Sequence, residues 1–166
     1  MIIGIFSDSH DNMEMIEKAV DLFNSRKVHL VIHAGDFVAP FAIEPMEKLH
    51  CQLVGVFGNN DGERIGLYKR FQDIGEVHNN LADIEIAGRR ICAVHYPELA
   101  EPIALSGLYD LVIYGHTHKI DIRTIRIKAD HESVLLNPGE TGGWVTGRST
   151  VAIVDLKSML VEICDL

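Results

Sequence analysis

The chain has few cysteines, and none of the three lies in a CxxC pair. Cys51, Cys92 and Cys164 are odd in number, so neither a disulfide framework nor a thiolate metal site is expected. Buried, reduced thiols are the simpler interpretation, and they favour a cytoplasmic location.

Long apolar runs and an excess of basic residues are also lacking. No apolar segment approaches the length that spans a bilayer, and the first ten residues lack the basic region of a signal peptide. Lys plus Arg number 15 against 24 Asp plus Glu, which gives a formal net charge of -9. This charge argues against membrane partners and against a nucleic-acid surface, because both kinds of binding rely on basic patches. A phosphate substrate stays open, since a bound cation makes an acidic site locally positive.

The composition is that of an ordinary globular protein, with 47% hydrophobic and 23% charged residues. A chain of 166 residues fits a single domain, 1–166, that buries its own core. In the first half, short apolar runs alternate with amphipathic segments, which predicts a parallel sheet. The expected strands are 2–6, 29–33 and 52–57, and the expected helices are 11–27, 39–50 and 63–74. Asp11 followed by Glu14 resembles a capping box, so the first helix is expected to begin at Asp11.

The second half has a different pattern, in which apolar and polar residues alternate over short segments. This pattern favours antiparallel strand pairing. Segments 81–87 and 90–95 flank a turn and predict a hairpin. The other expected elements are a helix at 98–106 and strands at 111–114, 120–128, 133–137, 150–155 and 159–163. Together the two halves predict an α/β fold of two packed mixed β-sheets flanked by helices.

Five apolar runs end in short polar segments. In an open α/β sheet, the loops at the carboxyl ends of the strands form the ligand crevice, so these five loops can converge. They would bring together Asp8, His10, Asp36, Asn59, His95, His116 and His118. All seven side chains offer oxygen or nitrogen, which suits divalent Mn, Fe, Zn, Ni or Co. Seven ligands are too many for one small ion and are about right for two ions that share a carboxylate.

Each segment alone has a structural alternative. The segment from Asp8 to His10 fits a capped strand-to-helix turn, segment 58–62 is a good turn sequence, and His95 can simply close a strand. His33 lies inside an apolar run, as a satisfied core histidine does, although it could support Asp36 from behind. The joint occurrence at strand ends is what favours a metal site.

The sequence resembles the calcineurin-like metallophosphoesterase superfamily, specifically its small single-domain bacterial and archaeal phosphodiesterases. The family blocks are D-x-H, G-D, G-N-x-D/E, H and G-H-x-H. They stand here in order as Asp8-Ser9-His10, Gly35-Asp36, Gly58-Asn59-Asn60-Asp61, His95 and Gly115-His116-Thr117-His118, with Asn137-Pro138-Gly139 following. The resemblance implies a four-layer sandwich, which agrees with the fold expected above.

Two divalent metal ions are implied by the same resemblance. Asp8, His10, Asp36 and His118 would hold the first ion, and Asp36, Asn59, His95 and His116 the second, with Asp36 bridging. Mn²⁺ is the expected metal, and Ni²⁺, Fe²⁺, Zn²⁺, Co²⁺ or Mg²⁺ would also fit.

The implied activity is hydrolysis of a small phosphodiester substrate by a hydroxide that bridges the two metals. Asp36 and Asn60 would be catalytic, and Asn59 and Asn60 would contact the substrate. The resemblance also implies a homo-oligomer, expected to be a dimer.

The chain departs from the family pattern at two places. Many relatives carry His where this chain has Asn60, and an amide cannot act as a general acid at neutral pH. Activity on alkyl phosphomonoesters is therefore expected to be weak, and Asn60→His is expected to raise it. The second departure is Tyr96-Pro97 after His95, which alters the pocket rim and leaves the substrate class open.

Two other functions remain as alternatives. A phosphatase or nuclease could use the same site. No basic, aromatic groove for a polynucleotide is evident in the sequence. The basic residues Arg64, Lys69 and Arg70 fit a solvated helix face. A non-catalytic scaffold is the other, because a retromer subunit of this family uses the fold to bind protein partners. A scaffold freed from catalysis should have lost metal ligands, whereas all seven positions here hold competent residues.

Overall fold

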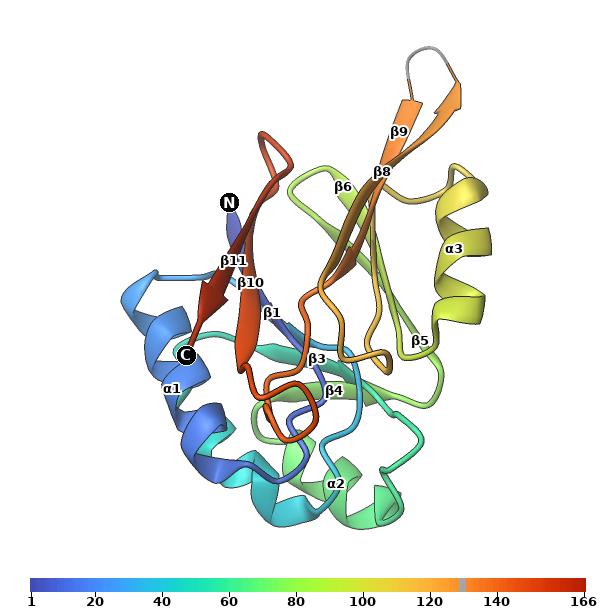
Figure 1. The fold of residues 1–166 in the computed structure, drawn as a ribbon. Helices are drawn as coiled ribbons and strands as arrows, with labels where there is room; N and C mark the ends of the chain where they lie inside the picture. Colours follow the sequence, from blue (N-terminus) through green and yellow to red (C-terminus); the bar gives the residue numbers. More distant parts are fainter. Residues whose placement is uncertain (129–130) are drawn as a thin grey trace.

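The computed structural model describes residues 1–128 and 131–166. Two β-sheets pack face to face, with helices on both outer faces (Figure 1). The fold is therefore α/β, with two packed mixed sheets flanked by helices, as the sequence predicted. In the described part of the chain, every helix is too short or too polar to cross a bilayer.

The first sheet has six strands in the order β11-β10-β1-β2-β3-β4. Strands β1 to β4 pair in parallel, while β10 pairs antiparallel with both β1 and β11. The strand bounds are β1 Ile2–Phe6, β2 Val31–His33, β3 Leu53–Val56, β4 Gly75–His78, β10 Thr150–Asp155 and β11 Leu160–Asp165. Strand β4 was not among the predicted strands, because only Val77 of its four residues is buried and no apolar alternation marks it.

The second sheet has five strands in the order β5-β6-β7-β9-β8. Its bounds are β5 Leu81–Ile86, β6 Arg89–Val94, β7 Leu111–Ile113, β8 Asp121–Lys128 and β9 His131–Asn137. Only the two edge pairs are antiparallel; β6, β7 and β9 run parallel. The expectation of mostly antiparallel pairing in the second half was therefore wrong in part. A crossover through α3 (Pro97–Leu105) joins β6 to β7, and such a crossover brings successive strands together in parallel.

Three helical segments cover the outer face of the first sheet. They are α1 Met13–Ser25, the 3₁₀ helix η1 Pro40–Lys48, and α2 Arg64–Phe71. Helix α1 buries the apolar face expected from its sequence: Ile16, Ala19, Val20 and Phe23. The expected α-helix near 39–50 is a 3₁₀ helix instead, and it contains Pro45, which has no N–H for an α-helical hydrogen bond.

The start of α1 also differs from the expected capping box. Asn12 is the N-cap, and its side chain accepts a hydrogen bond from the Met15 amide at 3.4 Å. Asp11 instead has a positive φ of 56° and accepts from the amide of Ala39 at 3.0 Å. Asp11 therefore ties the start of α1 to the loop after β2.

One hydrophobic core lies between the sheets. Apolar side chains of the first sheet, such as Ile5 and Ile32, pack there against Ile91 and Ile113 of the second. Helix α3 covers the opposite face of the second sheet. This stacking places the loops after β1, β2, β3, β6 and β7 at one end of the sandwich.

Candidate metal centre

Five of the seven predicted ligands occupy strained backbone positions. Their φ angles lie between 42° and 67°, in the left-handed region that residues with a Cβ seldom adopt. They are Asp8, His10, Asp36, His116 and His118. Each such position costs of the order of 1 kcal/mol or more, and strain of this kind concentrates at functional sites. The loops are therefore shaped to direct these side chains rather than to relax the backbone.

Backbone hydrogen bonds join the loops that carry the ligands. The amide of Asp8 donates to the carbonyl oxygen of Gly35 at 2.9 Å, which links the ends of β1 and β2. The amide of His116 donates to both carboxylate oxygens of Asp8 at 3.1 Å, which links the second sheet to the first. The expected convergence of loops from both halves of the chain is confirmed.

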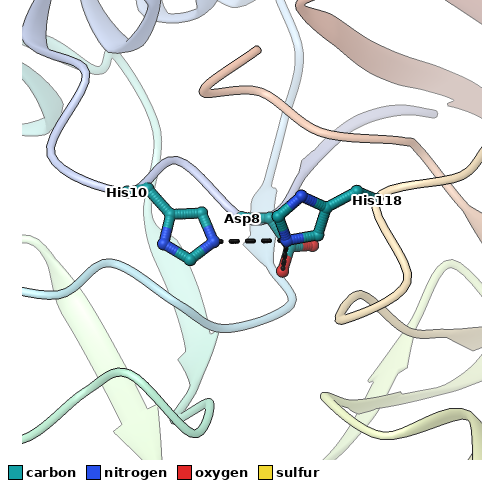
Figure 2. Close-up of side chains that lie close together, drawn as sticks. All are labelled: Asp8, His10 and His118. Atoms are coloured by element: carbon teal, nitrogen blue, oxygen red, sulfur yellow. Dashed lines mark hydrogen bonds and ion pairs between the residues drawn. The ribbon is translucent and has the colours of Figure 1, made fainter. Parts of the chain in front are cut away.

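The first group consists of Asp8, His10 and His118, which have ligand atoms close enough to hold one ion (Figure 2). His118 Nε2 lies 3.5 Å from Asp8 Oδ1 and 3.3 Å from His10 Nε2. Asp8 comes from the end of β1, while His118 comes from the loop after β7, 110 residues later in the chain. Only the packing of the two sheets brings them together.

The second group lies beside the first and contains the remaining ligands. His95 Nε2 lies 3.0 Å from Asn59 Oδ1 and 3.5 Å from Asp36 Oδ2. His116 Nδ1 lies 2.8 Å from the same Asn59 oxygen. Asp8, Asp36 and His95 also satisfy the spacing of a single-ion site, so Asp8 borders both groups.

Asp36 stands between the two groups. Its Oδ2 atom lies 3.6 Å from His10 Nε2 and 3.5 Å from His95 Nε2. Burial alone would raise the pKa of this carboxyl, but the hydrogen bond and charge of His95 and the donors of Asn60 hold it well below its usual range. Asp36 is therefore an anion that faces both groups at once, as a shared ligand must.

Asp8 has the opposite electrostatic balance. Its side chain is fully buried, and desolvation raises its pKa to about 7, although the hydroxyl of Ser7 offsets part of that effect. The protein groups around Asp8 thus supply too little positive charge for a stable carboxylate at neutral pH.

The residues fit the binding of divalent metal. Two imidazole nitrogens, His10 Nε2 and His118 Nε2, face each other at 3.3 Å with carboxylate oxygens beside both. Neutral rings that present lone pairs to one another repel, and a cation between them removes the conflict. The donor set is imidazole, carboxylate and amide oxygen, which suits borderline and hard divalent metals. No cysteine belongs to either group in the described residues.

Two buried acidic residues that were not among the predicted site residues also support the site. Asp61 accepts three backbone N–H groups, from Gly58 at 2.6 Å, Val38 at 2.8 Å and Asp36 at 3.0 Å. It therefore locks the loop after β2 to the loop after β3. Glu140 lies 3.3 Å from His118 Nδ1. Asp61 could have been noticed in the G-N-x-D/E block, whereas no motif pointed to Glu140.

Two aromatic side chains lie at the rim. The Tyr96 ring is 5.1 Å from the His95 ring and 5.2 Å from the His116 ring, measured between centroids. Trp144 is exposed, and its Nε1 donates to the carbonyl oxygen of His10 at 3.0 Å. Both rings therefore border the candidate centre, one beside each group.

Known proteins resemble this chain in sequence and in fold. The chain is 41% identical over 162 residues to a protein named Phosphodiesterase MJ0936 from Methanocaldococcus jannaschii, covering 95% of this chain and 94% of that one. A solved structure described as a novel archaeal phosphodiesterase matches with a TM-score of 0.92 and 36% identity, over 100% of both chains. A structure of a Vps29 single mutant from Entamoeba histolytica matches with a TM-score of 0.70 at 17% identity, over 100% of this chain and 99% of that one, and so shares the fold.

The family model described as "Calcineurin-like phosphoesterase superfamily domain" matches residues 1–159, nearly the whole chain. The family resemblance drawn from the five sequence blocks is confirmed. The chain belongs to the calcineurin-like phosphoesterase superfamily.

Proposed function

We propose that the protein is a metal-dependent phosphodiesterase that acts on a small phosphodiester substrate. One observation carries the proposal: seven side chains with oxygen or nitrogen donor atoms, from five loops, lie together at one end of the sandwich, with Asp36 between two groups of them. The 41% identity to a protein named a phosphodiesterase supports the same class of reaction.

The residues divide between two ions as the family resemblance implies. Asp8, His10 and His118 would hold one ion, and Asn59, His95 and His116 the other, with Asp36 shared. When bound, the two ions, with Mn²⁺ the expected metal, would polarise the phosphoryl oxygens and lower the pKa of a water shared between them, giving the expected hydroxide nucleophile. The acidic surface is no obstacle, because the positive charge is supplied locally.

Asn60 orients the shared carboxylate. Its backbone N–H donates to Asp36 Oδ1 and its side-chain amide donates to Asp36 Oδ2, each at 2.8 Å. An amide has no proton to transfer at neutral pH, so Asn60 cannot protonate a departing alkoxide. Leaving groups of low pKa, as in aryl esters, need no such proton. We therefore propose weak activity on alkyl phosphomonoesters.

Tyr96 shapes the rim of the site on the side of His116. Pro97 follows it and restricts its backbone to the extended conformation, which is observed with φ -94° and ψ 134°. The ring thus has a fixed place beside His95 and His116, where the ester group of a substrate would contact it.

Metal-loaded protein and an aryl phosphodiester provide the test. We expect bis(4-nitrophenyl) phosphate to be hydrolysed with Mn²⁺ and not after treatment with EDTA. Asp36→Asn should lower kcat/KM by about 100-fold or more, because charge stabilisation at the transition state is lost. Asp73→Asn changes an exposed carboxylate and should leave the rate unchanged.

Full turnover by Asp36→Asn would contradict the proposal. So would a wild-type protein that hydrolyses nothing with Mn²⁺, Ni²⁺, Fe²⁺, Zn²⁺, Co²⁺ or Mg²⁺, and that result would favour the non-catalytic scaffold.

We also propose a homodimer in the cytoplasm. Light scattering of the purified protein checks the first point and cell fractionation the second.

A further inference from the structure

Glu140 is a buried carboxylate behind one of the candidate ligands. It lies three residues after the end of β9, and only 1% of its surface is exposed. Its Oε1 atom is 3.3 Å from His118 Nδ1. Among the residues that the structure describes, this buried ring nitrogen has no hydrogen-bond partner. The carboxylate is therefore the group placed to accept a hydrogen bond from Nδ1 when the ring carries its proton there.

The other nitrogen of the same ring points to the candidate centre. Figure 2 shows His118 directing Nε2 toward His10 and Asp8, while its second nitrogen points away from them. Nε2 lies 3.3 Å from His10 Nε2 and 3.5 Å from Asp8 Oδ1. A proton on Nδ1 would leave the Nε2 lone pair free for an ion.

We propose that Glu140 is a positioning residue that holds His118 in the tautomer with its proton on Nδ1 and fixes the direction of Nε2. This inference rests on the proposed function, since it assigns Nε2 to a metal. A carboxylate behind a metal-binding imidazole sets the tautomer, limits ring rotation and makes the ligand more basic.

Other hydrogen bonds fix Glu140 in place. Its carboxylate accepts the backbone N–H groups of Val145 at 3.0 Å and Thr146 at 2.8 Å, together with the Thr146 hydroxyl at 2.8 Å. These donors come from one short loop that returns to the carboxylate. Glu140 therefore cannot follow His118 if the ring turns, and this rigidity is what positioning requires.

The same loop is attached to the segment that carries Asp8 and His10. The amide of Gly142 donates to the carbonyl oxygen of Asp8 at 3.0 Å, and Trp144 Nε1 donates to that of His10 at 3.0 Å. All three ligands of the first group are thus tied to residues 140–144. Within residues 1–128 and 131–166, the side-chain contacts of Glu140 are with Val145, Thr146 and His118, and none is with the second group, so its effect should be confined to one ion.

The first test uses unmodified, metal-free protein. Long-range ¹H–¹⁵N correlation spectra of the histidine side chains report which ring nitrogen carries the proton. We expect His118 to carry it on Nδ1 near pH 8. A proton on Nε2, directed to Asp8, would overturn the proposal. This measurement needs no variant and no metal, so it stands even if a Glu140 variant fails to fold or the proposed function is wrong.

The second test compares Glu140→Gln with Thr146→Val by calorimetric titration with Mn²⁺. Glu140→Gln removes the negative charge, whereas Thr146→Val removes one donor to the same carboxylate and keeps the charge. We expect Glu140→Gln to weaken one of two binding events by 10–100-fold and to leave the other unchanged. Thr146→Val should stay within about 3-fold of wild type at both.

Unchanged affinities in Glu140→Gln would overturn the proposal, as would an equal loss in Thr146→Val, which would mean that Glu140 merely closes the loop. A wild-type protein that binds no Mn²⁺ would instead refute the proposed function, and the spectra of the metal-free protein would then decide this inference alone.

Discussion

The Nδ1 atom of His95 lies 2.8 Å from the carbonyl oxygen of Ala34. A carbonyl oxygen only accepts, so His95 donates from Nδ1, and the neutral ring carries its lone pair on Nε2. That lone pair faces Asn59 Oδ1 at 3.0 Å and Asp36 Oδ2 at 3.5 Å. Three acceptors then surround one space, and they repel unless a proton or a metal ion is present.

Metal binding should therefore stabilise the folded protein. An ion that binds only the folded state raises the free energy of unfolding by about 2.7 kcal/mol at a concentration 100 times its Kd. We expect the midpoint of urea unfolding to rise on addition of Mn²⁺ and to return to its starting value with EDTA. His118→Gln should lose much of the gain, while His50→Gln, at an exposed position, should retain it. A urea midpoint that does not change on addition of Mn²⁺ would argue against the proposed metal site.

Gly58→Ala should damage the site through direct overlap with Asp36. A Cβ at Gly58 would collide with Asp36 Oδ1 and lie 2.6 Å from the Asp36 backbone nitrogen. The carboxylate would have to move, so we expect at least about a 10-fold loss of Mn²⁺ affinity and a destabilisation of about 1–3 kcal/mol.

Gly62→Ala is the matched control, four residues further on. A Cβ there meets no described atom within 4 Å, so its stability should stay within about 0.5 kcal/mol of wild type. Calorimetric titration and urea unfolding measure both variants. Equal Mn²⁺ affinity in Gly58→Ala and wild type would show that Asp36 tolerates displacement.

His33 is the satisfied core histidine that its apolar surroundings suggested. Its Nδ1 accepts from the Gly35 amide at 3.1 Å, and its Nε2 lies 3.0 Å from the Ser9 hydroxyl oxygen. The ring stacks on Phe37 with centroids 3.7 Å apart. Desolvation by burial lowers its pKa well below the usual value, although the charge of Asp36 opposes the shift.

The lowered pKa of His33 makes stability depend on pH in a defined direction. Above about pH 6.5 the ring is neutral in both states and contributes nothing to the slope. Below it, the unfolded chain binds a proton that the folded chain does not, so the free energy of unfolding falls with falling pH, by up to about 1.4 kcal/mol per pH unit. His33→Gln should show a shallower slope between pH 6.5 and 5 in urea titrations with EDTA present. His50→Gln should keep the wild-type slope, and identical slopes in His33→Gln and wild type would contradict this assignment.

Asn60→His should broaden the substrate range. An imidazole at this position could protonate a leaving alkoxide, and general acid catalysis typically contributes 10²–10⁴-fold. We expect hydrolysis of an alkyl phosphomonoester to rise by at least about 10-fold, while the rate on an aryl diester changes less. Asn60→Gln, which keeps an amide, should not produce this gain. An unchanged monoester rate in Asn60→His would mean that the leaving group is not protonated from this position.

The sequence by itself determined the elements with strong local patterns and the residues that end them. Strands β1 and β10 matched their expected bounds. The seven candidate ligands could be proposed from the sequence because each lies in a polar segment that follows a short apolar run. The spacing of apolar residues reports burial along a single strand or helix, and a polar residue at its end stands out locally.

Tertiary structure decided what depends on contacts between distant residues. In the folded chain β10 pairs with β1, and β9 runs parallel to β7. The N-cap of α1 is Asn12, whereas the sequence predicted Asp11. It also brought Glu140 behind His118, a pairing that no local pattern marks. Strand pairing and the placement of supporting carboxylates depend on packing and desolvation energies across the whole fold. The spacing of residues along the sequence does not contain this information.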